Sequence, residues 1–526
     1  MNNNVVNLPN ILLAKIINEL KDNLDKLYLT LVCKRWFDIR DSILSFDCQD
    51  CYLVKFEQKR FFLKSYISTF NHSYMRKDNG ALLFGSSLAG KRFHYRLNYR
   101  NKYRVPNSTR EIYFDAEFNL NIDNMLMKLS MSNVTHIYFN DNFKQPIAKG
   151  LFPPTIKLIS FGYYWNHPID EGVLPAHLES LSFIGCFNQP INEKSLPSTI
   201  KHLKLSVLFD YKHLFANDKL LPCNLQSLDI PRSNKELIPP GFLPANLTEI
   251  KSLFVDELLL PSVLPSSIRS ISLDIGSQTN RLAIPIGVTS LTIDSSSNGW
   301  RLKNVDLPTT LRCLTLEDYN HQLEENDLPN DIEELTLVNY HINNLPIVNS
   351  KSIKTLKLLL TYVNTPLEIG CIPQGVEQLT FDLLNGIPLA PHIIPDSVRD
   401  LSFPTGRVKL VVGSLPPALQ SLTFDGDVVT PLLSNDLLPP SLERLTISIQ
   451  QAKTSLNLDI NTLFLTTKIN TMKIMSRSNI YWYIIRRLDQ SHAILSGGQS
   501  NTEYGIIKIT QLNTTISNKL STESDF

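Results

Sequence analysis

Residues 174–191 read Leu-Pro-Ala-His-Leu-Glu-Ser-Leu-Ser-Phe-Ile-Gly-Cys-Phe-Asn-Gln-Pro-Ile and contain the clearest copy of a pattern that recurs along the chain. Apolar residues stand three, six and eight positions after its first proline, and the same frame recurs along the middle of the chain. The prolines of this frame are Pro153, Pro175, Pro197, Pro222, Pro244, Pro265, Pro285, Pro308, Pro329, Pro373, Pro395, Pro416 and Pro439. A regular period of this size with a Leu-x-x-Leu-x-Leu core predicts a solenoid with one short strand per unit.

Copies that are partial or lack the proline begin near Pro106, Val134, Ile353 and Ile469, which gives about seventeen units over residues 106–474. Side chains alternate along a strand, so Leu181 and Phe183 and their equivalents should point inward. Each Leu-Pro pair suits a corner before the strand, because proline has no amide hydrogen for a ladder. The expected fold is mainly β, a leucine-rich-repeat-like solenoid of parallel strands.

The second half of each unit carries Phe-Asn-Gln-Pro-Ile at residues 187–191, echoed at 143–147 and 165–169. The aromatic ring should fill the interior, and the Asn amide can bond neighbouring backbone in successive turns. This phrase, together with the Leu-Pro frame, resembles the FNIP repeat, a relative of leucine-rich repeats. The copy at Pro244 departs from the pattern, because Ser252 occupies its last strand position.

The columns of the repeat that should face water are the candidates for binding a target. A Ser and Thr column seven residues after the proline is interrupted by Lys204, Asp229 and Lys251. Two residues further along the predicted strands stand Asp274, Asp294, Glu317, Asp382 and Asp425. Equivalent residues of stacked strands lie about 4.8 Å apart, so these side chains should form an acidic, hydroxyl-rich strip that holds a basic segment of a target. Alternatively, Ser and Thr simply suit exposed strands.

Four residues after the proline, the charge alternates in five consecutive units, at Arg312, Glu333, Lys354, Glu377 and Arg399. Opposite charges in adjacent strands attract each other, at roughly 0.2–1 kcal/mol per pair. We interpret this column as a stabilising ladder of ion pairs and not as a site.

Residues 6–46 are expected to form a separate, small all-α module, because apolar residues recur there at helical spacing. Leu8-Pro9, Ile16-Ile17-x-x-Leu20 and Val32-Cys33-Lys34-Arg35-Trp36 together resemble an F-box, which docks on the SKP adaptor of cullin-RING ubiquitin ligases. The resemblance implies that Leu8 and Pro9 contact the adaptor and that Ile16, Leu20 and Leu31 form the apolar docking face. It also implies that Val32 and Trp36 pack the module and help to fix its adaptor-binding surface. The alternative is an ordinary helical cap that covers the first repeat.

The remaining segments flank the array. Residues 47–105 read as a connector or N-terminal cap, and their basic and aromatic stretch at 55–104 leaves RNA binding as a weak alternative. Strands expected at 481–485 and 505–509 would form a C-terminal cap over residues 475–514, because the open end of a stack needs covering. Residues 515–526 are rich in Ser, Thr and Asn and are expected to be disordered.

Composition narrows the class of function. Lys and Arg total 51 against 50 Asp and Glu, so overall charge gives no reason to expect nucleic acid as a partner. The seven cysteines are scattered and odd in number, which favours a reducing compartment such as the cytoplasm or nucleus. The sequence shows no leader pattern and no long apolar run, so we expect no association with a membrane. No catalytic, metal-binding or cofactor-binding motif is present, so we expect no enzyme. The resemblances imply a target-recognition subunit of an SCF-type ligase, with an unknown protein target. A repeat scaffold without a ligase is the alternative.

Overall fold

The computed structural model describes residues 8–20, 23–44, 80–84, 109–114, 118–119, 122, 133–210, 212–213, 220–230, 238–255, 263–275, 282–294, 301–321, 323–324, 327–342, 352–363, 367–383, 388–405, 408–425, 435–449, 459–476, 482–497 and 503–516. The chain divides into two compact units. The repeat unit comprises Ala81–Leu88 and His94–Leu419, and the terminal unit comprises Met1–Gly80, Ala89–Phe93 and Gln420–Phe526. Each unit is described by itself below.

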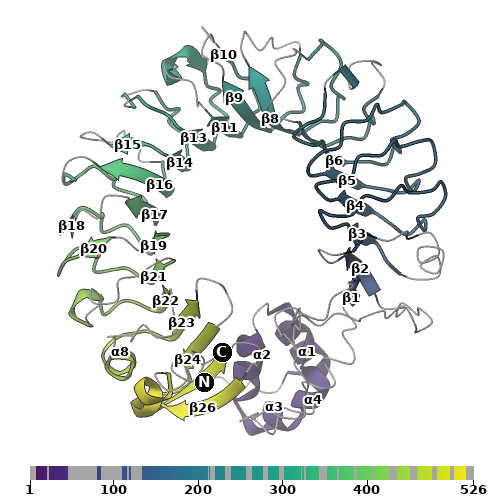
Figure 1. Ribbon diagram of the computed structural model, residues 1–526. Coiled ribbons are helices and arrows are strands. Elements are labelled where there is room, and N and C mark those ends of the chain that lie inside the picture. Colours follow the sequence, from purple (N-terminus) through teal and green to yellow (C-terminus); the bar gives the residue numbers. More distant parts are fainter. Residues whose placement is uncertain are drawn as a thin grey trace. The chain divides into compact units, whose positions relative to one another are not determined.

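The repeat unit is built on a parallel ladder in which successive strands lie side by side (Figure 1). Its strands are β2 Thr109–Phe114, β3 His136–Tyr138, β4 Leu158–Phe161, β5 Ser180–Phe183, β6 His202–Lys204, β7 Ser227–Asp229, β8 Glu249–Val255, β9 Ser270–Ile275, β11 Ser290–Asp294, β13 Cys313–Glu317, β14 Glu334–Val338, β16 Thr355–Val363, β17 Gln378–Leu383 and β19 Asp400–Phe403. A further strand, β1 Gly80–Phe84, pairs with β2. The parallel solenoid predicted from the Leu-Pro period is confirmed.

The pairing is in register from one repeat to the next. Leu181 of β5 pairs with Ile159 on one side and with Leu203 on the other, and all three side chains are buried. Phe183 pairs with Phe161, and both rings lie in the interior. The residues six and eight positions after each proline therefore form continuous apolar columns, as the two-residue period of a strand requires.

The second half of each turn runs through short segments with little regular structure. Small parallel pairs form there between β10 Leu282–Ala283 and β12 Val305–Asp306, and between β18 Pro388–Leu389 and β20 Lys409–Leu410. Strand β15 His341–Ile342 pairs with the far end of β16, and a 3-10 turn covers Leu302–Asn304. These turns therefore combine short parallel pairs with irregular backbone.

Two stacks of aromatic rings fill the first turns of the array. The strand stack contains Phe139, Phe161 and Phe183, with successive centroids 5.2 and 5.5 Å apart. The return stack contains Trp165, Phe187 and Phe209, with successive centroids 5.7 and 5.9 Å apart. The two stacks touch, since the rings of Phe183 and Phe187 lie 4.0 Å apart. Offset stacking of large rings adds to the apolar area that each turn buries.

The asparagines of the repeat phrase tie neighbouring turns together, as predicted. Asn188 donates its backbone N–H to Asn166 Oδ1 at 3.0 Å, and Asp210 donates its own to Asn188 Oδ1 at 2.9 Å. Trp165 donates its indole N–H to the carbonyl of Gln145 at 3.0 Å. These bonds satisfy backbone groups that the irregular segments would otherwise leave unpaired.

The terminal unit continues the repeat frame and then changes to antiparallel pairing. Strands β21 Ser421–Phe424, β22 Arg444–Ile449 and β23 Thr471–Ser476 pair in parallel. Strands β24 Trp482–Arg487, β25 His492–Gly497 and β26 Glu503–Lys508 then follow in antiparallel order. The structure places strands at the two expected segments, and β25 between them was not predicted.

Short helices complete the terminal unit. Helix α8, Ile460–Thr466, precedes β23 inside the segment expected to be pure repeat, and 3-10 turns cover Asn435–Leu437 and Ile509–Gln511. The N-terminal helices are α1 Asn10–Glu19, α2 Asn23–Thr30, α3 Lys34–Asp38 and α4 Arg40–Ile43.

Some predictions of organisation remain predictions. The total of about seventeen units and the domain boundaries at 46, 105, 474 and 514 are not tested. The two compact units meet in the sequence at Leu419, which is a different kind of division. Of the basic segment 55–104, only residues 80–84 lie within the described part, and residues 517–526 of the expected disordered tail lie outside it.

Candidate protein-binding surfaces

Helix α1 has two apolar faces, and only one of them is covered. Leu13 and Ile17 are buried, with 1% and 0% of their surface exposed. Ile11, Leu12 and Ile16 remain 74%, 47% and 48% exposed. A helix of a soluble protein normally turns its charged side to water, so an uncovered row of large apolar side chains indicates an interaction surface.

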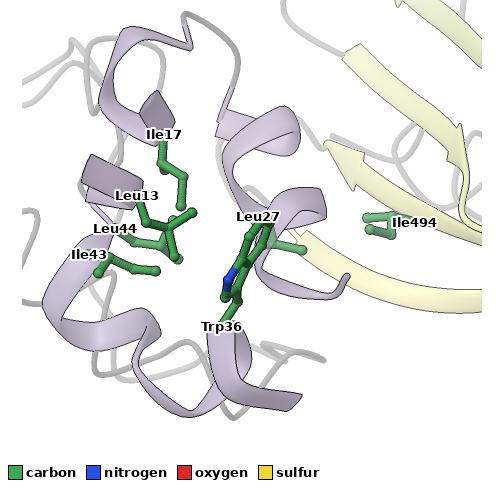
Figure 2. Packing of buried hydrophobic residues seen from close by; sticks show 7 residues of the cluster. All are labelled: Leu13, Ile17, Leu27, Trp36, Ile43, Leu44 and Ile494. Atoms are coloured by element: carbon green, nitrogen blue, oxygen red, sulfur yellow. The ribbon is translucent and has the colours of Figure 1, made fainter. Parts of the chain in front are cut away.

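The covered face holds the helices together in the terminal unit. Figure 2 shows Leu13, Ile17, Leu27, Trp36, Ile43 and Leu44 pointing toward one another from the four helices, with Ile494 contributed by β25. Asp25 of α2 also forms an ion pair with Arg486 of β24. Short helices are marginal by themselves, so this packing against the antiparallel strands explains why they form.

The predicted adaptor-binding residues fall into exposed and packed groups. Leu8 is half-buried and Pro9 is exposed. Arg35 holds this segment before α1 in place by donating from Nη2 to the Leu8 carbonyl at 2.9 Å. Ile16 and Val32 are exposed, whereas Leu20 is half-buried.

Two of the expected positions differ from the sequence-based assignment. Leu31 was expected on the docking face, but it is half-buried and packs against the helical core. Val32 was expected to pack the module together with Trp36, but only Trp36 is buried, and Val32 is 53% exposed. Val32 lies in the short connection between Thr30, which ends α2, and Lys34, which begins α3, so helical periodicity does not predict its direction.

Ile11 and Leu12 belong to the exposed row but were not predicted as contact residues. The signal was present, because Leu12 and Ile16 are four residues apart and therefore share a helix face. We define the apolar docking row as Ile11, Leu12, Ile16 and Val32.

The charged residues predicted on the sheet surface are paired with each other. Lys204 Nζ lies 2.9 Å from Asp229 Oδ2 in the next strand, which is the register expected for position seven. Lys251 Nζ lies 3.2 Å from Glu249 Oε1 within β8. These three predicted residues are therefore brought together on β6, β7 and β8, although as ion pairs at the surface.

The predicted acidic column is in register but is not uniformly exposed. Asp294 pairs with Asp274 of β9 and with Glu317 of β13, so three carboxylates occupy adjacent rungs. The expectation that all of them face water is wrong for Asp294 and Asp382, which are only 7% and 3% exposed. Asp294 ends its strand, where the simple alternation of faces no longer applies. Asp382 accepts a hydrogen bond from the Thr405 hydroxyl, and Asp425 accepts one from Ser448 at 3.0 Å.

A third surface lies at the entrance to the strands. We call the residue four positions after each proline the pre-strand column, and its members are joined by backbone hydrogen bonds from turn to turn, as from Glu179 N to Lys157 O at 2.8 Å. Two of its predicted ion pairs are present, with Lys354 2.8 Å from Glu377 and Arg312 3.7 Å from Glu333.

In an earlier part of the same column, Glu179 accepts from Lys157 and Lys201, each at 2.9 Å. These hydrogen bonds lower the pKa of Glu179 to about 2, since they favour the charged carboxylate. The column is therefore an ordered set of charges along one edge of the sheet.

Within the described residues, no three His, Cys, Asp or Glu side chains are grouped so that they could hold a metal ion. No described helix combines the length and the apolar character needed to cross a membrane.

These features define a mainly β protein of stacked parallel repeats with exposed candidate binding surfaces. The FNIP repeat family model matches residues 132–164, 165–208, 364–406 and 409–449, so the predicted FNIP repeats are found there. Among solved structures, the chain is similar to CroV588, described as a novel circular LRR protein. The two chains are 20% identical with a TM-score of 0.35, over 76% of this chain and 72% of that one. No curated protein matches the chain.

Proposed function

We propose that this chain recognises target proteins for a cullin-RING ubiquitin ligase, with residues 8–32 docking on an SKP-type adaptor and the repeats binding the target. The coarser function is that of a repeat protein for protein–protein interaction, since stacked repeats offer long, rigid surfaces. Chemistry would belong to partner subunits, and this chain would contribute proximity. Such a complex would work in the cytoplasm or nucleus.

The apolar docking row is the observation that supports adaptor binding. Ile11, Leu12 and Ile16 of α1 are exposed, while Leu13 and Ile17 are buried and hold the helices together. A simple cap would bury its large apolar residues against the neighbouring elements. A row that stays uncovered in the terminal unit instead favours a separate protein partner.

Co-purification with a purified SKP-type adaptor tests this function. We expect intact protein to retain the adaptor and Ile16→Asp to lose it, because a buried, unpaired carboxylate at the interface is costly. Leu465→Asp is the matched control, since Leu465 is 57% exposed on α8 and outside the row. Failure of the intact protein to bind, or full binding by Ile16→Asp, would contradict the proposal.

A repeat scaffold without ligase association is the second candidate. Its supporting observation is that the helices pack on the terminal unit's own strands through Ile494, as a cap would. It would be favoured if the intact chain retained protein targets but never the adaptor.

A further inference from the structure

The pre-strand column alternates in charge over part of its length, but none of its members between Glu179 and Glu333 is acidic. From Lys201 the column continues with Gln226, Thr248 and Arg269. Backbone bonds link them in this order, from Gln226 N to Lys201 O at 2.7 Å, Thr248 N to Gln226 O at 2.9 Å and Arg269 N to Thr248 O at 2.8 Å. Lys201 and Arg269 therefore flank an interval of two neutral rungs. Between Arg312 and Arg399, in contrast, a carboxylate stands between each pair of cations.

A hollow of about 550 Å³ opens over the first part of this interval. Its lining includes Lys201, Gln226 and Thr248, and it extends over Lys157 and Glu179 at one end and Asn246 at the other. Gln226 and Thr248 are exposed, and Lys201 is half-buried. The hollow is therefore lined by polar side chains and accessible, and its two lysines share the single carboxylate of Glu179, which leaves one positive charge uncompensated.

The nearby carboxylates of the chain are already engaged. Glu179 is held by two lysines, and its pKa of about 2 keeps it charged. Glu249, which follows Thr248, accepts from Ser227 Oγ at 2.6 Å and pairs with Lys251 at 3.2 Å. Arg269 donates from Nη1 to the carbonyls of Ser266 and Ile268, and neither bond neutralises its charge.

We propose that this interval binds an acidic, extended segment of the target protein, which crosses Gln226 and Thr248 and pairs its carboxylates with Lys201 and Arg269. The inference rests on the proposed function of the repeats as a target-binding surface and names the chemistry of the target. Lys201 and Arg269 are three rungs apart, or about 14 Å at the usual strand spacing. An extended segment spans that distance in about four residues, so two carboxylates at that spacing reach both cations.

This assignment differs from the sequence-based prediction of an acidic strip for a basic target. That strip lies on the sheet surface, where Lys204 and Asp229 neutralise each other and Asp294 and Asp382 are buried. The interval from Lys201 to Arg269 lies just before the strands, at one edge of the sheet, and its charge is positive.

Fluorescence anisotropy with the full chain tests the inference, with a fluorescein-labelled peptide of eight glutamates as the probe. We expect binding that weakens with added salt, and no comparable binding of an eight-lysine peptide. Gln226→Glu supplies the missing carboxylate from the chain itself, so binding should weaken by about tenfold. Lys201→Gln should weaken it similarly.

Gln420→Glu is the matched control, because Gln420 is an exposed glutamine of the same column outside this interval. It should change the affinity by less than about twofold, as expected for a distant charge screened by salt. Equal affinity for Gln226→Glu and the parent, or tighter binding of eight lysines, would overturn the inference. Retention of a single-stranded RNA that Lys201→Gln abolishes would also overturn it, in favour of nucleic acid.

The same protein samples are scored for SKP-type adaptor binding. If the protein binds the adaptor but not the acidic peptide, only this inference is wrong. If the protein binds the acidic peptide but not the adaptor, the proposed ligase function is wrong and the site for an acidic segment stands.

Discussion

Phe187 illustrates how one residue type stabilises the whole array. Its ring lies 4.0 Å from Phe183 in the strand stack and between Trp165 and Phe209 in the return stack. The phrase Phe-Asn-Gln-Pro-Ile therefore supplies both an interior ring and, at the next position, an amide that bonds the following turn. Each residue contacts only its own and the adjacent turns, so a substitution should destabilise mainly those turns.

Replacing Phe187 with Ala should destabilise the protein by about 3–5 kcal/mol, because it removes a fully buried ring and leaves a cavity. Chemical denaturation followed by tryptophan fluorescence would measure the loss, since Trp165 is the neighbouring ring. Ile184→Ala in the same turn is the control, because Ile184 is 46% exposed and should cost less than about 0.5 kcal/mol. Equal costs would contradict the stacked interior.

Glu179 provides a pH-dependent test of the pre-strand column. Its pKa is lowered from 4.5 to about 2 by hydrogen bonds from Lys157 and Lys201. A folded-state pKa below the unfolded one contributes stability that is present above pH 4.5 and lost as the pH falls toward 2.

Replacing both lysines with Met should return the pKa of Glu179 toward 4.5, measured by NMR titration of its side-chain carboxyl carbon. Lys194→Met with Lys212→Met is a control of equal charge, since neither lysine contacts Glu179 in the described ion pairs. A pKa that stays near 2 in the Lys157 and Lys201 variant would refute the ion-pair explanation.

At the scale of elements, the loops after the strands are packed as closely as the strands themselves. Tyr164 N donates to Asp141 O at 3.0 Å, and Cys186 N donates to Tyr163 O at 2.6 Å. Gly162 and Gly185 make this approach possible, since a Cβ on Gly162 would lie 2.0 Å from the Asn140 carbonyl oxygen. The glycines are therefore required by close backbone contact.

Gly162→Ala should destabilise the first repeats by more than about 2 kcal/mol, because the obstructing atoms belong to backbone and cannot move alone. Thermal denaturation monitored by circular dichroism would measure it. Ser160→Ala on the same strand is the control, and its outward side chain predicts a small effect. A Gly162→Ala protein as stable as the parent would show that these loops are looser than described.

How far the sequence predicts the elements depends on how strongly each one repeats. The Leu-Pro period predicts the parallel strands well, because an error in register would move every inward residue to water. Helix α8 was missed, since Ile460–Thr466 spans less than two turns and gives little periodicity. Its signal was the cap, where Asp459 Oδ1 accepts from Thr462 N at 3.0 Å.

The candidate site was predictable only in part. Helix α1 is apolar at Ile11, Leu12, Leu13, Ile16 and Ile17, so the sequence alone does not say which side is covered. Packing against the other helices and Ile494 decides that Leu13 and Ile17 are inside. Similarly, the register of Asp294 followed from the repeat, but its burial depends on how the strand ends.

At the scale of the whole chain, two kinds of surface have separate tasks in our account. The apolar docking row belongs to the terminal unit, and the interval from Lys201 to Arg269 belongs to the repeat unit. Apolar surface supplies most of the affinity in a stable interface, while charges supply specificity and association rate. Variants of one surface should therefore leave the other partner bound.

Hydrogen–deuterium exchange of the full chain, with and without a purified SKP-type adaptor, would show whether the helices dock on the adaptor. Our account predicts that the adaptor slows exchange in residues 8–32, around the apolar docking row, and leaves the strands from β4 to β17 unchanged. Protection confined to the repeats, or no protection anywhere at saturating adaptor, would contradict the account.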